Sequence, residues 1–330
     1  MFDVYGIGNA LVDTEYEVTD ELLIAASLPK GQMTLMNRQE REQLINLLER
    51  DHNHKVVKQA GGGSAANTLV AVAQLGGRGF YSCKVAADVI GDFFLEDLNS
   101  ASVKTNLDET ERSSDGTSGQ CVSMITPDAE RTMTTHLGIS ETLSPSELDR
   151  DALTKSTYLY IEGYLVTSPT AMDAVREAQH IVRAAGGKVS ITLSDMSMVQ
   201  RFGDIFTDLF DTGIDLIFCN EEEAMGWTQT SSRSDALRRL RAVCQQIVIT
   251  CGSDGALVYD GSGEVFVPGV PINAVDTTGA GDMFAGAFLY GITAGLNFEG
   301  AATLANRAAS QLVSAFGARL EKSRVDTLLA

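Results

Sequence analysis

Basic residues are scarce in this sequence. Its 330 residues include 25 Lys and Arg against 44 Asp and Glu, a formal net charge of −19. Nucleic acids and anionic membranes are bound through basic surfaces, so neither is an expected partner. Uncharged apolar runs of about 18 residues are also missing, so we expect no membrane-spanning helix. The first residues lack the basic stretch and apolar run of a signal peptide, and a cytoplasmic location is therefore expected.

Metal-ligand and phosphate-loop patterns are missing too. The five cysteines are odd in number, scattered and without a CxxC pair, which predicts reduced thiols rather than a disulfide framework. The four histidines form no HExxH or similar spacing, so a structural zinc site is not expected. The absence of a Walker A motif and of the HRD and DFG pair excludes the two commonest kinase classes.

The sequence does contain a regular alternation of short apolar strands and amphipathic helices. This alternation predicts an α/β fold with a mostly parallel sheet covered on both faces. No internal repeat or flexible linker divides residues 1–330, so a single domain is expected. The expected strands are Phe2–Gly8, Gly79–Val85, Thr157–Glu162, Lys188–Leu193, Asp215–Cys219 and Gln246–Thr250, and the expected helices include Asn37–Arg50, Ser64–Leu75, Ser168–Ala185, Ser234–Val243, Gly279–Gly295 and Phe298–Phe316.

One segment interrupts the alternation. Gln120–Thr126 and Glu130–His136 flank the turn Thr126–Ala129, which predicts a β-hairpin. An antiparallel insert does not easily extend a parallel sheet. We therefore expect a small lid from about 14–36 and 105–138, which could also form a dimer interface, so both a monomer and a lid-mediated homodimer are open. An ordinary surface hairpin is the alternative.

The segment from Asp276 to Phe288 carries the clearest chemical pattern. In it, Gly279, Ala280 and Gly281 open a long apolar helix, so their backbone N–H groups converge at a helix N-terminus. Free amides and the helix dipole suit that place for an anion such as a transferring phosphoryl group. Asp282 follows in the first turn, where a carboxylate can accept a proton from an attacking hydroxyl.

This segment resembles the C-terminal signature of the ribokinase-like (PfkB) carbohydrate kinases. Four other blocks resemble family elements and occur in the family's order between Gly6 and Gly317. They are Gly6–Asp13, Gly61–Thr68, Asn220–Ala224 and Thr250–Gly255. The resemblance implies a three-layer α/β fold with a small β lid. It also implies transfer of the γ-phosphoryl of ATP, with Mg²⁺, to a primary hydroxyl of a sugar or nucleoside.

Several residues are candidates for holding the acceptor. Gly62 and Gly63 permit a close backbone approach, and Asn67 lies one helical turn further on. Asp13, expected at the carboxyl end of a strand, and Asn67 together offer donors and acceptors suited to hydroxyls. Glu162 stands where sugar kinases often have a polar sugar-binding residue.

Other residues are candidates for the nucleotide and for cations. Asn220 and Glu223 follow a strand at its carboxyl end, and the resemblance assigns Glu223 to ordering Mg²⁺ through water. The resemblance further places ATP at Thr250, Gly252, Gly255 and Asn306, and a possible monovalent cation such as K⁺ at Asp276, Thr278, Ala315 and Gly317.

Alternatives remain open at this point. Gly61–Ala66 matches a dinucleotide fingerprint, with Asp88 about 20 residues on, so an NAD(P)-dependent oxidoreductase is one alternative. A catalytically silent nucleotide-binding regulator on the same fold is another. The acceptor is also ambiguous. Tyr160–Leu165 looks most like the adenosine-kinase-like branch, whereas Ser64–Asn67 resembles the generic sugar-kinase loop.

The acidic balance raises one more expectation. None of the phosphate-site motifs contains Lys or Arg, so backbone amides, the helix N-terminus and Mg²⁺ must supply most of the positive field. Arg131 and Arg307 are taken as the only basic residues close in sequence to the lid or nucleotide segments, with undefined roles.

Overall fold

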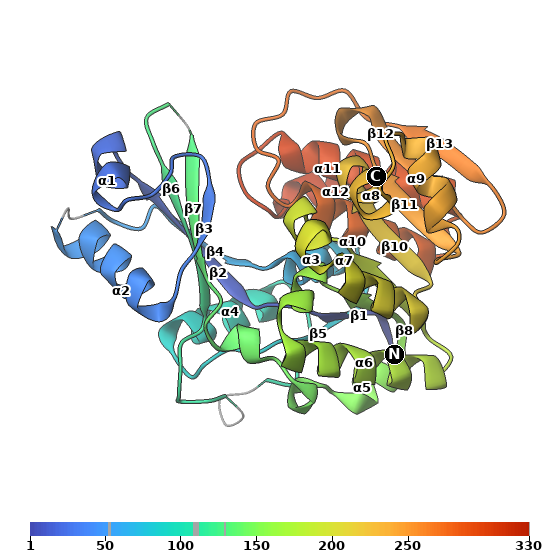
Figure 1. Ribbon diagram of the computed structural model, residues 1–330, viewed down its shortest axis with the longest axis horizontal. Helices are drawn as coiled ribbons and strands as arrows, with labels where there is room; N and C mark the ends of the chain where they lie inside the picture. Colours follow the sequence, from blue (N-terminus) through green and yellow to red (C-terminus); the bar gives the residue numbers. More distant parts are fainter. Residues whose placement is uncertain (52–53, 108–111, 129, 330) are drawn as a thin grey trace.

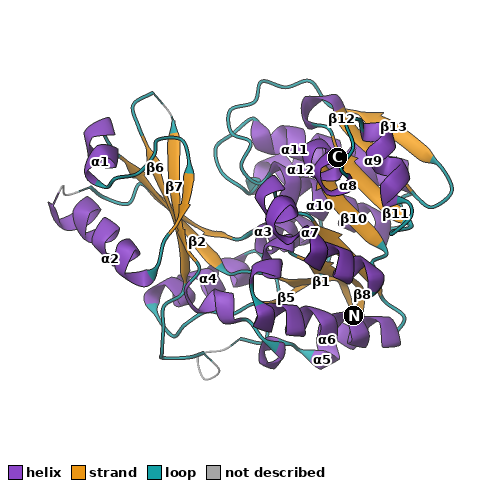
Figure 2. Ribbon diagram, viewed as in Figure 1, coloured by secondary structure: helices purple, strands orange, loops and turns teal. Residues whose placement is uncertain are grey.

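A computed structural model describes residues 1–51, 54–107, 112–128 and 130–329. Its centre is an eight-stranded sheet in the order β13-β12-β11-β10-β9-β8-β1-β5 (Figures 1 and 2). The six strands from β11 to β5 are parallel, and β12 and β13 extend the sheet with antiparallel pairing. Their bounds are β1 Phe2–Ile7, β5 Gly79–Ser82, β8 Ser156–Ile161, β9 Lys188–Thr192, β10 Leu216–Asn220, β11 Gln246–Thr250, β12 Gly255–Tyr259 and β13 Glu264–Pro268.

Helices cover both faces of this sheet. Because side chains alternate along a strand, Leu216 and Phe218 of β10 enter one apolar core and Ile217 and Cys219 enter the other. The first core contains α3 Ser64–Gln74, α4 Val89–Ser100, α10 Ala280–Thr293, α11 Phe298–Val313 and α12 Lys322–Leu329. The second contains α5 Arg150–Thr154, α6 Pro169–Ala184, α7 Met196–Asp211, α8 Glu221–Thr228 and α9 Arg233–Leu240. The predicted three-layer α/β fold is confirmed.

A second sheet of five strands stands apart from the large one, at the left of Figure 1. Its order is β3-β7-β6-β2-β4, and a third apolar cluster joins its outer face to two helices. The antiparallel pairing of β6 with β7 confirms the predicted hairpin, although residue 129 of the turn lies outside the described residues. The bounds are β2 Leu11–Glu17, β3 Met33–Leu35, β4 Lys58–Gly62, β6 Gly119–Ile125, β7 Arg131–His136, α1 Asp20–Ala25 and α2 Arg38–Asn46.

Two features of this small sheet differ from the sequence expectations. Asp13 lies in the middle of β2 and not at the carboxyl end of a strand of the large sheet. The sheet also includes β4, whose residues 58–62 fall outside the ranges expected for the lid. The strand β4 was missed because its sequence, Lys-Gln-Ala-Gly-Gly, has neither β-branched residues nor apolar alternation.

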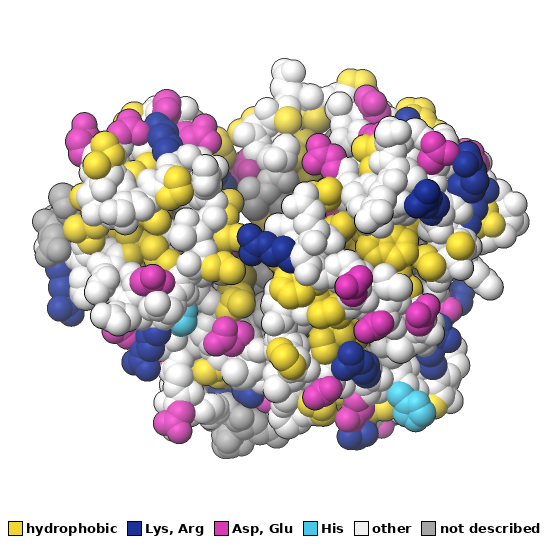
Figure 3. Space-filling view, viewed as in Figure 1, with side chains coloured by type: hydrophobic (Ala, Val, Ile, Leu, Met, Phe, Trp, Pro, Cys, Tyr) yellow, Lys and Arg dark blue, Asp and Glu magenta, His cyan; other side chains and the backbone are white. Residues whose placement is uncertain are grey.

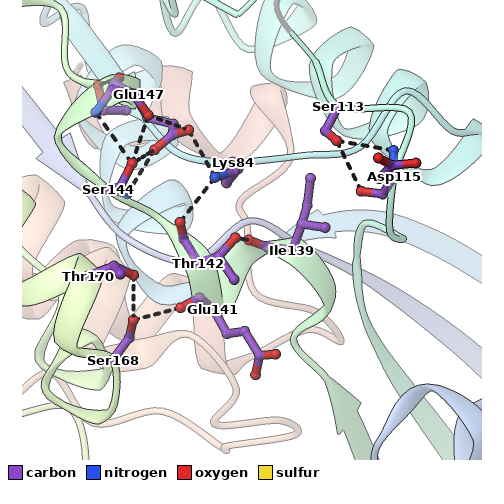
Figure 4. A network of polar contacts seen from close by, with 12 residues as sticks. Lys84, Ser113, Asp115, Ile139, Glu141, Thr142, Ser144, Glu147, Ser168 and Thr170 are labelled. Atoms are coloured by element: carbon purple, nitrogen blue, oxygen red, sulfur yellow. Dashed lines mark hydrogen bonds and ion pairs between the residues drawn. The ribbon is translucent and has the colours of Figure 1, made fainter.

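The chain returns from the small sheet to the large one through a polar network (Figure 4). Lys84, just after β5, donates through Nζ to Thr142 O at 3.1 Å and forms an ion pair with Glu147 Oε1 at 3.1 Å. The other Glu147 carboxylate oxygen accepts from the N–H of Ser144, 2.7 Å away. Ser168, the N-cap of α6, donates to Glu141 O at 2.6 Å. These bonds fix the connection that follows β7 against the body.

No helix among the described residues is long and apolar enough to cross a membrane.

Candidate active site

A cleft of about 710 Å³ lies between the small sheet and the large one. One wall comes from the inner face of the small sheet, with Asp13 and Arg131 among its residues. The floor comes from the last residues of three neighbouring parallel strands, Thr192, Asn220 and Thr250. The hollow is visible between the two parts in Figure 3. Carboxyl ends of parallel strands are where open α/β sheets place ligands, so this cleft is the candidate site.

The N-terminus of α10 opens into the cleft. Gly279 is left-handed, with φ 75°, and an added Cβ would lie 2.8 Å from the Ala318 backbone, so this position requires glycine. Ala280 donates its N–H to Thr277 O at 3.1 Å. The Gly281 N–H lies in the first turn of α10, where no preceding helical carbonyl is available to accept its hydrogen bond. A Cβ added at Gly281 would have no neighbouring heavy atom within 4 Å. The backbone at Gly281 is therefore open to a ligand.

Asp282 lies in the first turn of α10 with both carboxylate oxygens hydrogen-bonded. Oδ1 accepts from Ser64 Oγ at 2.7 Å, and Oδ2 accepts from Asn67 Nδ2 at 3.1 Å. Burial raises the pKa of Asp282 to about 6, although these two bonds and the charge of Arg319 act in the opposite direction. A carboxylate with this pKa is largely ionised at pH 7 and can still take up a proton, as a general base requires.

The predicted acceptor residues meet Asp282 at this point. Asp13 lines the cleft, and burial raises the pKa of its carboxyl to about 6. A Cβ at Gly62 would lie 2.4 Å from Asp13 Oδ2, and a Cβ at Gly63 would lie 2.3 Å from Asn9 O. The two glycines thus make room for the aspartate and for a close chain crossing. Asp13, Gly63 and Asp282 share one cleft, and Asn67 lies directly behind Asp282.

The nucleotide candidates divide into two groups. Asn220, Glu223 and Thr250 line the cleft. Asn220 and Glu223 form a reciprocal cap of α8, in which the Asn220 amide donates to Glu223 Oε1 at 2.7 Å and Glu223 N–H donates to Asn220 Oδ1 at 2.8 Å. Burial raises the pKa of Glu223 to about 7.

Other predicted residues lie outside the cleft lining. Gly252 and Gly255 shape the turn between β11 and β12, and a Cβ at Gly255 would lie 2.1 Å from Val267 O. Asn306 donates through Nδ2 to Val267 O and Pro268 O, both at 3.1 Å, and so joins α11 to the end of β13. Glu162 is buried beneath the glycine loop, where it accepts from Ala65 N–H at 2.9 Å and Asn9 Nδ2 at 3.0 Å. In this structure Glu162 positions the loop without lining the cleft.

Comparison with known proteins places this geometry in a family. The sequence matches the pfkB family carbohydrate kinases over residues 31–324, which is most of the chain. The chain belongs to the pfkB family. Its members are phosphotransferases that act on hydroxyl groups.

Three similar proteins refine the assignment of this pfkB kinase. The adenosine kinase of Saccharomyces cerevisiae is 28% identical over 311 residues, which cover 89% of each chain. The crystal structure of a probable sugar kinase protein from Rhizobium etli has a TM-score of 0.88 and 34% identity, and the match covers 99% of this chain and 97% of that one. The adenosine kinase structure from Sinorhizobium meliloti has a TM-score of 0.85 and 35% identity, with 99% and 98% covered.

The dinucleotide interpretation of Gly61–Ala66 does not fit the pfkB kinase structure. The fingerprint should follow a central strand of the large parallel sheet, but β4 is an edge strand of the small sheet and pairs antiparallel with β2. Asp88 is also engaged, because its carboxylate caps α4 by accepting from Gly91 N–H at 2.8 Å. The loop instead contributes Gly61, Gly63 and Ser64 to the lining of the cleft.

The cation candidates of the pfkB kinase differ in how well they fit. Glu223 lines the cleft with one carboxylate, which suits Mg²⁺ held through water and nucleotide phosphates, and the described residues contain no group of three metal-ligating side chains. Asp276 accepts from Thr278 N–H at 3.0 Å and Gly317 N–H at 2.9 Å, and Arg131 Nη1 lies 3.2 Å from its Oδ2. A guanidinium therefore already pairs with the Asp276 carboxylate, and the monovalent-cation site at Asp276, Thr278, Ala315 and Gly317 stays a prediction.

Basic residues of the cleft were misjudged from the sequence. Arg131 does line the cleft, but Arg307 does not, whereas Lys58 and Arg319 do. Lys58 was overlooked because β4 was not recognised, and Arg319 because it follows the last recognised motif residue, Gly317, by two positions. Ser64 was also missed as a partner of Asp282. The sequence did contain a signal for Ser64, because this residue directly follows the glycine loop and begins an expected helix.

Proposed function

We propose that this kinase transfers the γ-phosphoryl group of Mg-ATP to the primary hydroxyl of a nucleoside, with adenosine as the first acceptor to test. The observation that carries the proposal is the placement of Asp282 in the first turn of α10. There the carboxylate is bonded to Ser64 and Asn67 beside the glycine loop, and the open Gly281 backbone, where the phosphates would bind, lies next to it. Two adenosine kinases, which cover 89% and 99% of the chain, make adenosine the first acceptor to test, and the probable sugar kinase, which covers 99%, makes sugars the alternative.

In this mechanism Asp13 and Gly63 hold the acceptor, and Asp282 accepts the proton of the attacking hydroxyl. The Gly279 and Gly281 amides and the positive end of α10 stabilise the charge that develops on the transferring phosphoryl group, whereas the predicted Ala280 N–H is already bonded to Thr277 O. Phosphoryl transfer depends mainly on positioning and electrostatics, so these groups are sufficient. Glu223 and Asn220 would hold the Mg²⁺ side of the nucleotide, and the ion neutralises phosphate charge when bound.

ADP release in the presence of Mg-ATP tests this proposal. The acceptor panel contains adenosine, other nucleosides, ribose and hexoses. We expect ADP release that depends on an acceptor with a primary hydroxyl, which Asp282 deprotonates, and the highest kcat/KM with adenosine or another nucleoside. Preference for a hexose or free ribose would contradict the nucleoside assignment but retain the kinase. No acceptor-dependent ADP release with any compound would contradict the catalytic proposal itself.

A further inference from the structure

Arg319 connects three elements behind the cleft. It lies in the segment between α11 and α12, and only 15% of its side chain is exposed. Its Nε donates to Asn67 Oδ1 at 2.9 Å, and its Nη1 pairs with the Asp97 carboxylate of α4. Its Nη2 is buried and has no hydrogen-bond partner among the described residues. The guanidinium, which lines the cleft, is thus anchored to Asn67 and Asp97.

The contact with Arg319 determines which way the Asn67 amide faces. An amide presents an oxygen on one side and an NH₂ group on the other. Because Asn67 Oδ1 accepts from Arg319, its Nδ2 is directed to Asp282 Oδ2. The reverse orientation would place an oxygen against a carboxylate and an NH₂ group against a guanidinium. The Asp97–Arg319 pair therefore orients the Asn67 amide so that its Nδ2 donates to Asp282 and positions that carboxylate.

Gly61 leaves the space that this pair occupies. A Cβ added at Gly61 would lie 2.1 Å from Asp97 Oδ2 and 3.1 Å from Arg319 Nη2. The first glycine of the loop is needed for the pair, as Gly62 is needed for the Asp13 carboxylate. The three-glycine run thus accommodates both the acceptor aspartate and the group that aligns the base.

Arg319 is also a cation among acidic groups. Burial raises the pKa of both Asp13 and Asp282, and the charge of Arg319 lowers each of them. The other titratable groups that interact with Asp282 are Glu162 after β8 and the tyrosines Tyr81, Tyr160 and Tyr164. Arg319 supplies positive charge to both carboxyls, and Arg131 adds to it at Asp13, where Glu15 and Asp282 act in the opposite direction.

We propose that Arg319 is a positioning residue for phosphoryl transfer. Anchored by Asp97, it orients Asn67, and through Asn67 it holds the Asp282 carboxylate toward the acceptor hydroxyl. This inference rests on the proposed role of Asp282 as the base. It assigns a function to a residue beyond the recognised motifs and explains why Asn67, which does not line the cleft, affects the site.

Substitution of Arg319 tests the inference, with Arg324→Gln as a matched control. Arg324 lies in the same C-terminal segment and donates to Gln311 O at 2.9 Å and to Ser314 Oγ at 2.6 Å, without lining the cleft. We expect Arg319→Gln to lower kcat by about 10²-fold, the size of effect that a small misplacement of reacting groups produces. The KM for ATP should change little, and the KM for the acceptor should rise.

The pH profile separates positioning from a structural role. In Arg319→Gln the acid limb of kcat should move to higher pH, because Asp282 loses a neighbouring positive charge. Arg319→Lys keeps the charge but not the planar fork, so kcat should fall with the acid limb in place. An Arg319→Gln profile that matches Arg324→Gln, or a lower kcat with an unmoved limb, would overturn the inference.

Two further variants keep the result interpretable. If Arg319→Gln does not fold, Asp97→Asn releases the guanidinium while leaving its charge, and kcat should fall as in Arg319→Lys. Unchanged kcat in a folded Asp97→Asn protein would overturn the inference. Near-normal turnover by Asp282→Asn would instead refute the base and with it the proposed function. An inactive Asp282→Asn variant beside a normal Arg319→Gln variant would leave the proposed function intact and overturn the inference alone.

Discussion

Asp282 combines two properties that rarely occur together on a surface carboxylate. It accepts hydrogen bonds on both oxygens, which favour the ionised form, and yet burial raises its pKa to about 6. The balance leaves a group that is ionised at neutral pH but holds a proton more readily than an exposed aspartate. The same burial acts on Asp13, so two carboxyls of the acceptor region titrate in one pH range.

The raised pKa values predict the acid limb of the pH–activity profile. The base must be deprotonated, so kcat should be half-maximal near pH 6, close to full above about pH 7, and fall by about tenfold per pH unit well below the pKa of Asp282. Initial rates from pH 4.5 to 8.5, with stability checked by preincubation, measure this. A profile flat to pH 4.5 in a folded protein would contradict a base with this pKa.

At the residue scale the sequence predicted candidate residues that line the cleft but not the residues that support them. Asp282, Asp13 and Glu223 occur in recognisable blocks with glycines or helix starts beside them, and all three line the cleft. Arg319, Asp97 and Ser64 act through contacts between residues more than 200 positions apart, such as Asn67 with Arg319. Local pattern contains no information on such pairings, so these residues emerge only from the folded chain.

At the scale of elements, the N-terminus of α10 is the structure on which the account depends. Gly279 and Gly281 of this N-terminus are glycines for different physical reasons. Position 279 requires glycine for a left-handed φ and for its approach to Ala318, whereas Gly281 has free space around it. Substitutions at these two positions can therefore distinguish a glycine that folding requires from a glycine that ligand binding requires.

Gly279→Ala and Gly281→Ala form a matched pair. Gly279→Ala should destabilise the fold, because alanine is strained at φ 75° and would meet Ala318. Gly281→Ala should keep or raise the Tm, since alanine in a helix is favoured over glycine by about 1 kcal/mol. It should still raise the KM for ATP by about tenfold or more, because a methyl group enters the phosphate side of the cleft. Unchanged ATP kinetics in Gly281→Ala would contradict an anion site here.

The elements that the sequence predicted are those with a continuous apolar strand or a strong amphipathic face. Strand β11 was predicted with its observed bounds, and β1, β8, β9 and β10 within one or two residues. In the small sheet the β6–β7 hairpin was predicted, but β2 and β4 were not recognised as strands, because β4 is polar and glycine-rich and β2 is interrupted by acidic residues on its cleft face. An element that lines a polar site lacks the apolar pattern that identifies core strands.

The small sheet also carries a prediction about water. Its inner face covers the cleft, and we expect it to act as a lid that excludes water when the acceptor is bound. ADP release without acceptor should then be at least about 10²-fold slower than with adenosine, because water alone does not complete a well-positioned attack. The comparison uses one enzyme preparation at saturating Mg-ATP. Comparable rates with and without acceptor would refute closure over the site.

At the scale of the whole molecule, a net charge of −19 must be reconciled with a polyanionic substrate. The fold places positive charge at the cleft itself. Lys58, Arg131 and Arg319 line the cleft, and the N-terminus of α10 adds a partial positive charge. Arg131 and Arg319 already pair with Asp276 and Asp97, so their charge is partly compensated. Magnesium must supply much of the remaining positive charge at the phosphates.

This balance predicts a steep dependence of ATP binding on Mg²⁺. Titration calorimetry in excess EDTA should give an ATP Kd at least about tenfold weaker than in excess Mg²⁺. Adenosine binding, which involves no phosphate, serves as the internal control and should be insensitive to EDTA. Equal ATP affinity in both buffers would show that the protein alone neutralises the triphosphate.

The central claim is that Asp282 is the general base, and turnover by Asp282→Asn tests it most directly. The amide keeps the shape of the side chain but cannot accept the proton. We expect kcat to fall by about 10²–10⁴-fold with the Kd for Mg-ATP nearly unchanged. The Tm should be equal or higher, because a buried charge is removed. Near-normal kcat in a folded Asp282→Asn protein would contradict the account.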